Sequence, residues 1–214
     1  MLLASSVEPP VKDLVILVAD KNMQFALRGA LARPEALGIR AVTSDFRPHM
    51  GRDGGARTTG VDVLALERRR FQHALLVFDL EGCGAEPEQT ADDLEQVLDR
   101  RLEALWGTQA KSIVIAPEVD IWLWGADVAL REALHWPLNG TVRDWLQTRG
   151  FSFDVHGKPA RPKEAMEALV RCCNLPRSAA LYEKITSRIS LRRCADPAFL
   201  RLRAVLRTWF PTAE

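Results

Sequence analysis

Several patterns that identify common classes of protein are missing from this chain of 214 residues. No apolar run reaches the ~18 residues that span a bilayer, and the N-terminus lacks the pattern of a signal peptide. The four cysteines form no Cys-x-x-Cys pair and no spacing typical of a disulfide framework, as expected for a reducing compartment. We therefore expect a cytoplasmic protein that makes no contact with a membrane.

Sequence motifs for zinc and for nucleotides are also missing. The four histidines are scattered, with no His-x-x-x-His or Cys/His spacing, so zinc has no support. Neither GxxxxGK[ST] nor GxGxxG occurs, which removes the two commonest nucleotide-binding loops. A cysteine nucleophile at Cys83 has little support, because no histidine stands near it in the sequence.

The net charge of +1 gives no general reason to bind nucleic acid, but the charge is unevenly distributed. Residues 1–157 hold 17 Lys and Arg against 23 Asp and Glu, whereas residues 158–214 hold 12 against 5. A basic C-terminal part can contact phosphate or an acidic partner, or it can pack on the acidic part of its own chain. The sequence leaves both alternatives open.

Apolar runs alternate with amphipathic stretches over the first two thirds of the chain. The runs expected to form buried strands are residues 14–19, 39–43, 74–78 and 112–116. Helical periodicity occupies the segments between them, at residues 23–31, 61–70 and 90–106. This alternation predicts an α/β fold with a parallel four-stranded Rossmannoid sheet flanked by helices.

The remainder of the chain carries only helical patterns. We expect an α/β domain over residues 11–136 and an all-helical C-terminal extension, residues 137–214, packed on it. Trp122 and Trp124 are expected to fill the core or a partner interface, with base stacking as the alternative.

Acidic residues follow three of the predicted strands directly. They are Asp20, then Asp79 with Glu81, then Glu118 with Asp120. The carboxyl ends of parallel strands meet at one edge of a sheet, where ligands of open α/β proteins bind. Carboxylates are the ligands that Mg²⁺ prefers, so Asp79, Glu81, Glu118 and Asp120 are candidate ligands of Mg²⁺ or Mn²⁺. The alternative is that each of these acids, taken singly, only caps the helix that follows its strand.

Residues 44–60 form the longest stretch without periodicity, and we expect a glycine-rich loop there. Arg47, Arg52 and Arg57 alternate with glycines in this stretch. Guanidinium groups and free backbone amides together can hold a phosphate group. A mobile surface loop without a ligand is the equal alternative.

At the acidic strand ends the chain resembles the Toprim-like families. In these the first strand ends in a catalytic acid within a Val-Glu-Gly-Lys type motif, and the third ends in an Asp-x-Asp type motif. The matching segments here are Val-Ala-Asp-Lys at 18–21 and Phe-Asp-Leu-Glu-Gly at 78–82. These families include type IA topoisomerases, bacterial primases and the overcoming-lysogenization-defect nucleases.

Two further segments resemble an uncharacterised bacterial Toprim-like family, some of whose members lie beside ATPases in phage-defence loci. Residues 116–122 (Ala-Pro-Glu-Val-Asp-Ile-Trp) are similar to its Pro-Glu-x-Glu-x-Trp stretch, and residues 189–199 are similar to its C-terminal helices. The resemblance implies Mg²⁺-dependent chemistry on phosphodiesters of DNA or RNA, with Asp20, Asp79, Glu81 and Glu118 as catalytic residues. It also implies a protein partner such as an ATPase.

One position departs from the Toprim motif. Ala19 stands where the family has its glutamate, and Asp20 follows one residue later. A shift of one residue in a strand turns a side chain to the other face, so Asp20 reaches the site only if the strand ends early. The alternative is therefore a catalytically degenerate subunit that keeps the fold and binds a protein partner.

Overall fold

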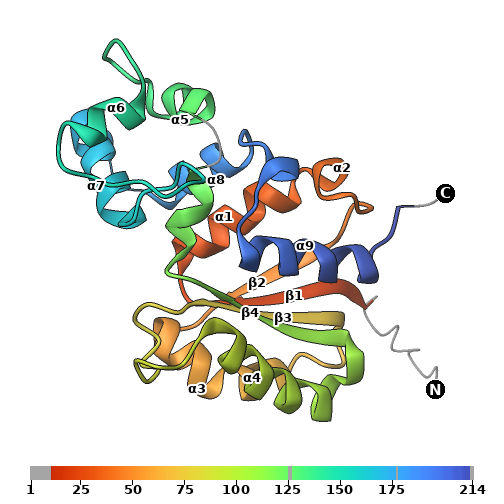
Figure 1. The fold of residues 1–214 in the computed structure, drawn as a ribbon. Helices are drawn as coiled ribbons and strands as arrows, with labels where there is room; N and C mark the ends of the chain where they lie inside the picture. Colours follow the sequence, from red (N-terminus) through yellow and green to blue (C-terminus); the bar gives the residue numbers. More distant parts are fainter. Residues whose placement is uncertain (1–10, 125–126, 177, 213–214) are drawn as a thin grey trace, which may run out of the picture.

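A computed structural model describes residues 11–124, 127–176 and 178–212 of the chain. Its centre is a four-stranded parallel sheet with the strand order β2-β1-β3-β4 (Figure 1). The strands are β1 (Lys12–Val18), β2 (Ser44–Pro48), β3 (Phe71–Asp79) and β4 (Ala110–Ile115). This confirms the prediction of an α/β fold with a parallel four-stranded sheet.

The two central strands are buried because helices cover both faces of the sheet. Residues 14–18 of β1 and 74–78 of β3 are fully buried, as uninterrupted apolar runs predict for a parallel sheet. In Figure 1, α3 (Arg52–Ala65) and α4 (Ala91–Trp106) lie on one face, and α1 (Lys21–Leu31) and α9 (Pro197–Trp209) lie on the other.

The helices that follow β4 continue the chain beyond the carboxyl ends of the strands (Figure 1). They are η2 (Val119–Leu123), α5 (Asp127–Leu134), α6 (Val142–Gln147), α7 (Pro162–Cys172) and α8 (Ala179–Thr186). Three short elements complete the described chain, namely α2 (Pro34–Leu37), η1 (Gly107–Gln109) and η3 (Leu191–Arg193). The C-terminal region is therefore helical, as predicted, apart from one β-bridge between Phe153 and Pro159.

Two predicted segments were wrong. The second strand begins at Ser44 and not within residues 39–43, and residues 44–60 are not a loop. They form β2 and the first half of α3, which joins the predicted helix at 61–70 and ends at Ala65. Buried Ala56, Gly60, Val61 and Leu64 have helical spacing, so a helical stripe was present in the sequence. The low helix propensity of glycine concealed it.

The glycines of α3 serve close packing. A Cβ atom on Gly60 would lie 2.6 Å from Leu76 Cδ1, and one on Gly55 would lie 2.3 Å from the His49 ring. Tertiary contact therefore requires small residues in a helix whose local propensity is poor. This is the physical reason that the expectation of a glycine-rich loop failed.

The basic C-terminal part packs on the acidic part of the same chain at several points. Arg201 Nη2 of α9 donates to Glu95 Oε1 of α4 at 2.9 Å, and the guanidinium lies 3.3 Å from Asp92. Arg207 donates to the Leu37 carbonyl at 2.8 Å. The charge distribution left two alternatives open. These contacts favour the one in which the basic part packs on the acidic part of its own chain.

Helix α8 packs closely on α1, and Gly29 makes this approach possible. A Cβ atom at Gly29 would lie 2.1 Å from Thr186 Oγ1 and 2.7 Å from the Glu183 carbonyl oxygen. Because one of these atoms belongs to the backbone of α8, the clash cannot be relieved by a rotamer change.

We expect Gly29→Ala to lower the free energy of unfolding by about 1–3 kcal/mol through this overpacking. The matched control is Gly54→Ala, where the nearest atom to a Cβ is 3.8 Å away. The control is expected to stabilise the chain by up to about 1 kcal/mol through helix propensity. Urea unfolding measures both. Equal stability changes in the two variants would contradict the close packing of α8 on α1.

Candidate functional site

The strand order creates a switch point between β1 and β3. The chain leaves β1 into α1 on one face of the sheet and leaves β3 toward α4 on the opposite face (Figure 1). In open α/β sheets the crevice beyond such a pair of strand ends is the usual ligand site. Asp79 is the last residue of β3, and Asp20 lies two residues beyond β1.

Asp79 stands at the centre of an acidic cluster. Its backbone N–H donates to Asp53 Oδ1 at 2.8 Å, and its Oδ1 accepts from the Val119 N–H at 2.9 Å. Desolvation raises the pKa of Asp79 well above its ordinary value, and the charge of Asp53 raises it further. Glu118 and Asp120 add smaller contributions of the same sign. A carboxyl group here is thus destabilised in its charged form.

Sequence reasoning missed Asp53, because residues 44–60 were interpreted as a loop. Asp53 lies in the first turn of α3, which places its carboxylate over the end of β3. Burial raises the pKa of Asp53, and the charge of Asp20 contributes. An acid in the first turn of a helix that follows a strand was the available signal.

Glu118 and Asp120 are deeply buried, with 5% and 4% of their surfaces exposed. Desolvation raises the pKa of each. Each also accepts a hydrogen bond from the C-terminal helices. Lys163 Nζ of α7 donates to Glu118 Oε2 at 2.8 Å, and the Tyr182 hydroxyl of α8 donates to Asp120 Oδ1 at 2.9 Å.

Lys163 and Tyr182 were not predicted, and no pattern in the sequence connects them with the acidic strand ends. Tyr182 is the single tyrosine of the chain. Lys163 is about half exposed at its side chain, so its ammonium group reaches the cluster from the solvent side. The hydrogen bond to Glu118 raises the pKa of Lys163, and the charges of Glu118, Asp120 and Glu81 raise it further. This lysine therefore offsets part of the negative charge of the cluster.

Asp20 and Glu81 lie at the border of the cluster. Strand β1 ends at Val18, and Asp20 adopts extended backbone with φ −152° and ψ −177°. Its Oδ1 caps α1 by accepting from the Met23 N–H at 2.9 Å, while its charge raises the pKa of both Asp53 and Asp120. The early strand end thus brings Asp20 near the cluster, whereas Ala19 is buried.

Glu81 is exposed, and its backbone N–H donates to the Pro117 carbonyl at 3.0 Å. This bond aligns the turn after β3 with the segment after β4. The charge of Glu81 raises the pKa of Glu118. The acids that the sequence singled out are therefore linked through pairwise charge effects on pKa, in which Asp53 and Lys163 also take part.

The donor set of this cluster consists of carboxylate oxygens, which suit a hard divalent cation. Burial is the largest cause of the raised pKa of four of these carboxyl groups, and neighbouring acids add to it. In the described part of the chain, however, no three His, Cys, Asp or Glu side chains already stand in the arrangement of a metal site. Glu118 and Asp120 point to Lys163 and Tyr182 instead.

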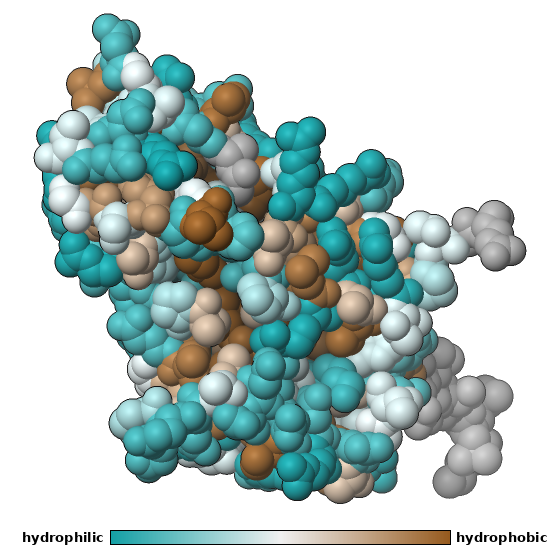
Figure 2. All heavy atoms as spheres, in the orientation of Figure 1, coloured by the Kyte–Doolittle hydropathy of each residue, from teal (hydrophilic) through white to brown (hydrophobic). Residues whose placement is uncertain are grey.

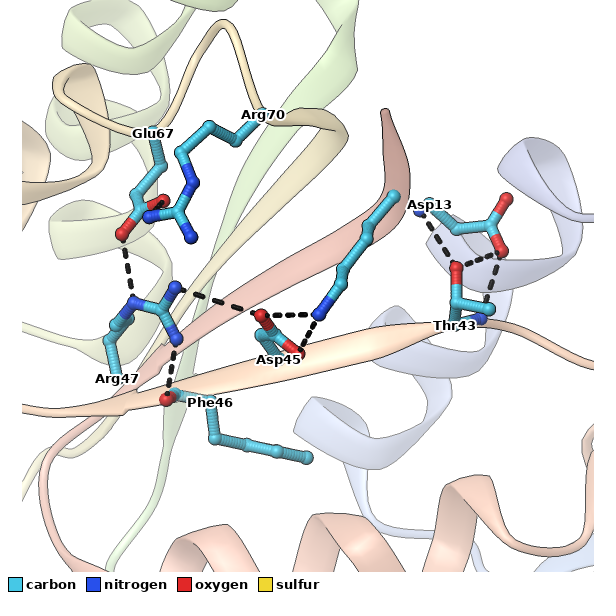
Figure 3. A network of polar contacts seen from close by, with 8 residues as sticks. Asp13, Thr43, Asp45, Phe46, Arg47, Glu67 and Arg70 are labelled. Atoms are coloured by element: carbon cyan, nitrogen blue, oxygen red, sulfur yellow. Dashed lines mark hydrogen bonds and ion pairs between the residues drawn. The ribbon is translucent and has the colours of Figure 1, made fainter. Parts of the chain in front are cut away.

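The three arginines predicted to bind phosphate are not gathered in one loop. Arg47 lies on the edge strand β2, where its Nε donates to Glu67 Oε1 at 2.8 Å and its guanidinium lies 3.7 Å from Asp45 (Figure 3). Arg57 lies within α3, and Arg52 is its exposed first residue.

Arg57 holds the turn after β3. Its Nε donates to the Cys83 carbonyl and its Nη2 to the Gly84 carbonyl, both at 2.8 Å. It thereby fixes the segment that carries Glu81 next to the first turn of α3. Arg47 and Arg57 already donate to acceptors of the chain, so the phosphate site stays a prediction without geometric support.

The two tryptophans and the cysteine that the sequence singled out are buried. Trp122 is 2% exposed and Trp124 is 8% exposed, so both fill the core. Trp122 Nε1 donates to Asp196 Oδ1 at 2.9 Å. Cys83 is buried, and His49 Nε2 lies 3.0 Å from Thr59 Oγ1 in α3.

Across the described ranges, no helix is long and apolar enough to cross a membrane. No family model matches the chain, and no curated protein or solved structure matches it either.

Proposed function

We propose that the chain is a Toprim-like domain that performs divalent-cation-dependent chemistry on phosphodiesters of DNA or RNA, as a component of a bacterial phage-defence system. One observation carries the proposal. Asp79 ends β3 at the switch point of the sheet, where burial, and then the charges of Asp53, Glu118 and Asp120, destabilise its charged form. The resemblance of the strand-end segments to Toprim motifs supplies the substrate class.

In this proposal Asp79, Glu81, Glu118 and Asp120 hold Mg²⁺ or Mn²⁺. The bound cation would neutralise phosphate charge and lower the pKa of a water molecule. Asp20 serves as the general base from its position beside the cluster. Asp53 orients the end of β3 through its bond to the Asp79 N–H, and Lys163 limits the charge of the cluster before substrate arrives.

The test is cleavage of single- and double-stranded DNA and RNA in Mg²⁺, in Mn²⁺ and in chelator. We expect cleavage only with the divalent cation, and its loss in the double variant Asp79→Asn with Glu81→Gln. The control is Asp62→Asn, an exposed acid 71% accessible at its side chain and outside the cluster. Cleavage that survives in the double variant would overturn the assignment of these residues.

A catalytically degenerate subunit is the second candidate. Two observations favour it: Ala19 replaces the expected glutamate, and Lys163 already occupies the Glu118 carboxylate as a counter-ion. Such a subunit would keep the fold and bind a protein partner such as an ATPase.

The two candidates differ in their response to cations. A site that binds Mn²⁺ stabilises the folded chain by about 2.7 kcal/mol when the ion is at 100 times its dissociation constant. If the chain is an enzyme, we expect Mn²⁺ to raise the midpoint of thermal unfolding, and we expect no such rise in the double variant. If it is a degenerate subunit, we expect neither this rise nor cleavage.

A further inference from the structure

Arginines gather around the short helix α2, which lies beside α9 (Figure 1). Arg192 Nη2 donates to the Glu35 carbonyl at 3.4 Å, and Arg207 Nε donates to the Leu37 carbonyl at 2.8 Å. Both acceptors are backbone carbonyl groups of α2. A carbonyl orients a guanidinium group but carries no net charge, so the positive charge of each arginine remains.

The segment between α8 and α9 connects further arginines to this group. Arg33 Nη1 donates to the Ile189 carbonyl at 2.6 Å, and Arg203 Nη1 donates to the Arg192 carbonyl at 3.3 Å. Two exposed arginines lie next to these carbonyl groups along the chain. We define the arginine surface as Arg33, Arg188, Arg192, Arg193, Arg203 and Arg207.

The acids of the chain do not neutralise this surface. In the described ranges, no carboxylate oxygen lies within 4.0 Å of any of the six guanidinium groups. Arg201, which faces Asp92 at 3.3 Å, is the arginine of α9 that packs on the acidic part of the chain. Helix α9 contains no acid, and Glu35 is the only acid in residues 33–38 and 186–193. Six positive charges therefore stand against one negative charge.

A hollow of about 330 Å³ lies between α2 and η3 within this surface. Arg33 and Arg192 line it together with Ser190 and Glu35. Within the described chain, Arg33 donates only through Nη1 and Arg192 only through Nη2. A guanidinium group has five N–H donors in a planar fork that matches a phosphate group. Both arginines therefore keep donors for oxygen atoms of a ligand.

We propose that the arginine surface binds the phosphate backbone of a nucleic acid. The core of a protein interface needs aromatic or apolar residues, whereas residues 33–38 and 186–193 include no exposed large hydrophobic side chain. Nucleic-acid interfaces are polar and strongly positive instead. The inference rests on the proposed function in taking the bound nucleic acid as the substrate of the acidic cluster.

The experiment measures binding in chelator, so that cleavage plays no part. The probes are a short fluorescent DNA duplex, a single strand of RNA, and polyglutamate. The test variant is Arg188→Gln with Arg193→Gln, because both residues are exposed and neither makes a hydrogen bond or ion pair in the described chain. Circular dichroism checks that each variant is folded.

The matched control is Arg68→Gln with Arg69→Gln. These two exposed arginines lie between α3 and β3 and are also without a hydrogen bond or ion pair among the described residues. The control therefore removes the same charge from another part of the surface. It separates a local site from a general effect of net charge.

The salt dependence of binding counts the phosphate contacts. Each contact with a duplex contributes about 0.9 to the slope of log affinity against log salt concentration. We expect this slope to become shallower by about 2 in the test variant and to stay unchanged in the control. Each single variant, Arg188→Gln or Arg193→Gln, should change the slope by about 1. The single variants replace the double variant if that does not fold.

Three results would contradict the inference. They are the absence of DNA and RNA binding at low salt, an equal change of slope in the test and control variants, and preferential binding of polyglutamate. Polyglutamate that binds more tightly than nucleic acid, and is weakened only in the test variant, would assign the surface to an acidic protein.

The proposed function is tested separately, by cleavage with a divalent cation. Cleavage together with an unchanged slope in the test variant would keep the proposed function and overturn the arginine surface. The expected change of slope without cleavage would keep the arginine surface and count against the proposed function.

Discussion

Asp79→Asn is expected to stabilise the metal-free chain and to abolish its cation-dependent activity. At neutral pH the folded chain must either keep Asp79 charged among other acids or keep it protonated at a pH where a free carboxyl group loses its proton. Both options oppose folding, since the unfolded chain ionises this group freely. Asparagine is neutral and can still accept from the Val119 N–H. We expect a gain of about 1–2 kcal/mol, which is common when function has been favoured over stability.

The pH dependence gives the sign of this effect. Burial raises the folded-state pKa of Asp79 above the ordinary value of 3.8, so the folded chain holds a proton that the unfolded chain releases. This contributes stability below the unfolded pKa, and the contribution is lost as the pH rises through the folded pKa. Urea unfolding should therefore show a free energy of unfolding that falls with pH between the ordinary pKa of 3.8 and the raised folded-state pKa. The slope should be smaller in Asp79→Asn.

Asp62→Asn serves as the matched control for this substitution. Its carboxylate is 71% exposed and lies 3.6 Å from Arg101, and exposed pairs of this kind contribute less than about 1 kcal/mol. An Asp79→Asn variant that is less stable than the control at neutral pH would contradict the electrostatic description of the cluster. An unchanged rate of cation-dependent cleavage would contradict the assignment of Asp79 to the site.

Asp196→Ala is expected to have the largest effect on stability, with a loss of about 3–5 kcal/mol. Asp196 is 5% exposed and caps α9 by accepting from the Phe199 N–H at 3.1 Å. It also accepts from Trp122 Nε1 and lies 3.4 Å from Lys158 Nζ, whose side chain is 12% exposed. Alanine would leave a buried ammonium and a buried indole N–H without this partner.

Two variants separate the contributions of Asp196. Asp196→Asn keeps an acceptor for the cap and for Trp122 but removes the charge opposite Lys158, so its loss should be smaller. Thr90→Ala removes only a cap, that of α4, and should lower the free energy of unfolding by about 1 kcal/mol. Chemical denaturation of Asp196→Ala, Asp196→Asn and Thr90→Ala measures the loss in free energy of unfolding of each and so tests this order. A loss in Asp196→Ala no larger than in Thr90→Ala would contradict the buried network.

The elements that the sequence predicted correctly are those whose local pattern and tertiary environment agree. The largely apolar runs at 14–19, 74–78 and 112–116 became β1, β3 and β4, since strands buried on both faces of a sheet are predominantly apolar. Helix α4 was equally clear from its apolar stripe, and the structure adds a capping box of Thr90 with Asp93.

The failures have a shared cause. Edge strand β2 is short and carries Asp45 and Arg47, which pair with Lys12 and Glu67 (Figure 3). Such charges protect an edge against pairing with other chains, but they hide the strand from a search for apolar runs. Helix α3 was hidden by glycines that the sheet requires. Figure 2 shows one face of the molecule, on which hydrophobic residues lie among hydrophilic ones.

For the candidate site, the sequence by itself determined that acids follow the strands β1, β3 and β4, and parallel strands require that these ends share an edge. Only the tertiary structure decided which other residues join them. Asp53 arrives through the start of α3, and Lys163 arrives through a helix 45 residues beyond Glu118. Their placement depends on packing between distant segments, which no local pattern encodes. Local periodicity specifies the strands and their ends, whereas the charge balance of the cluster is set by long-range contacts.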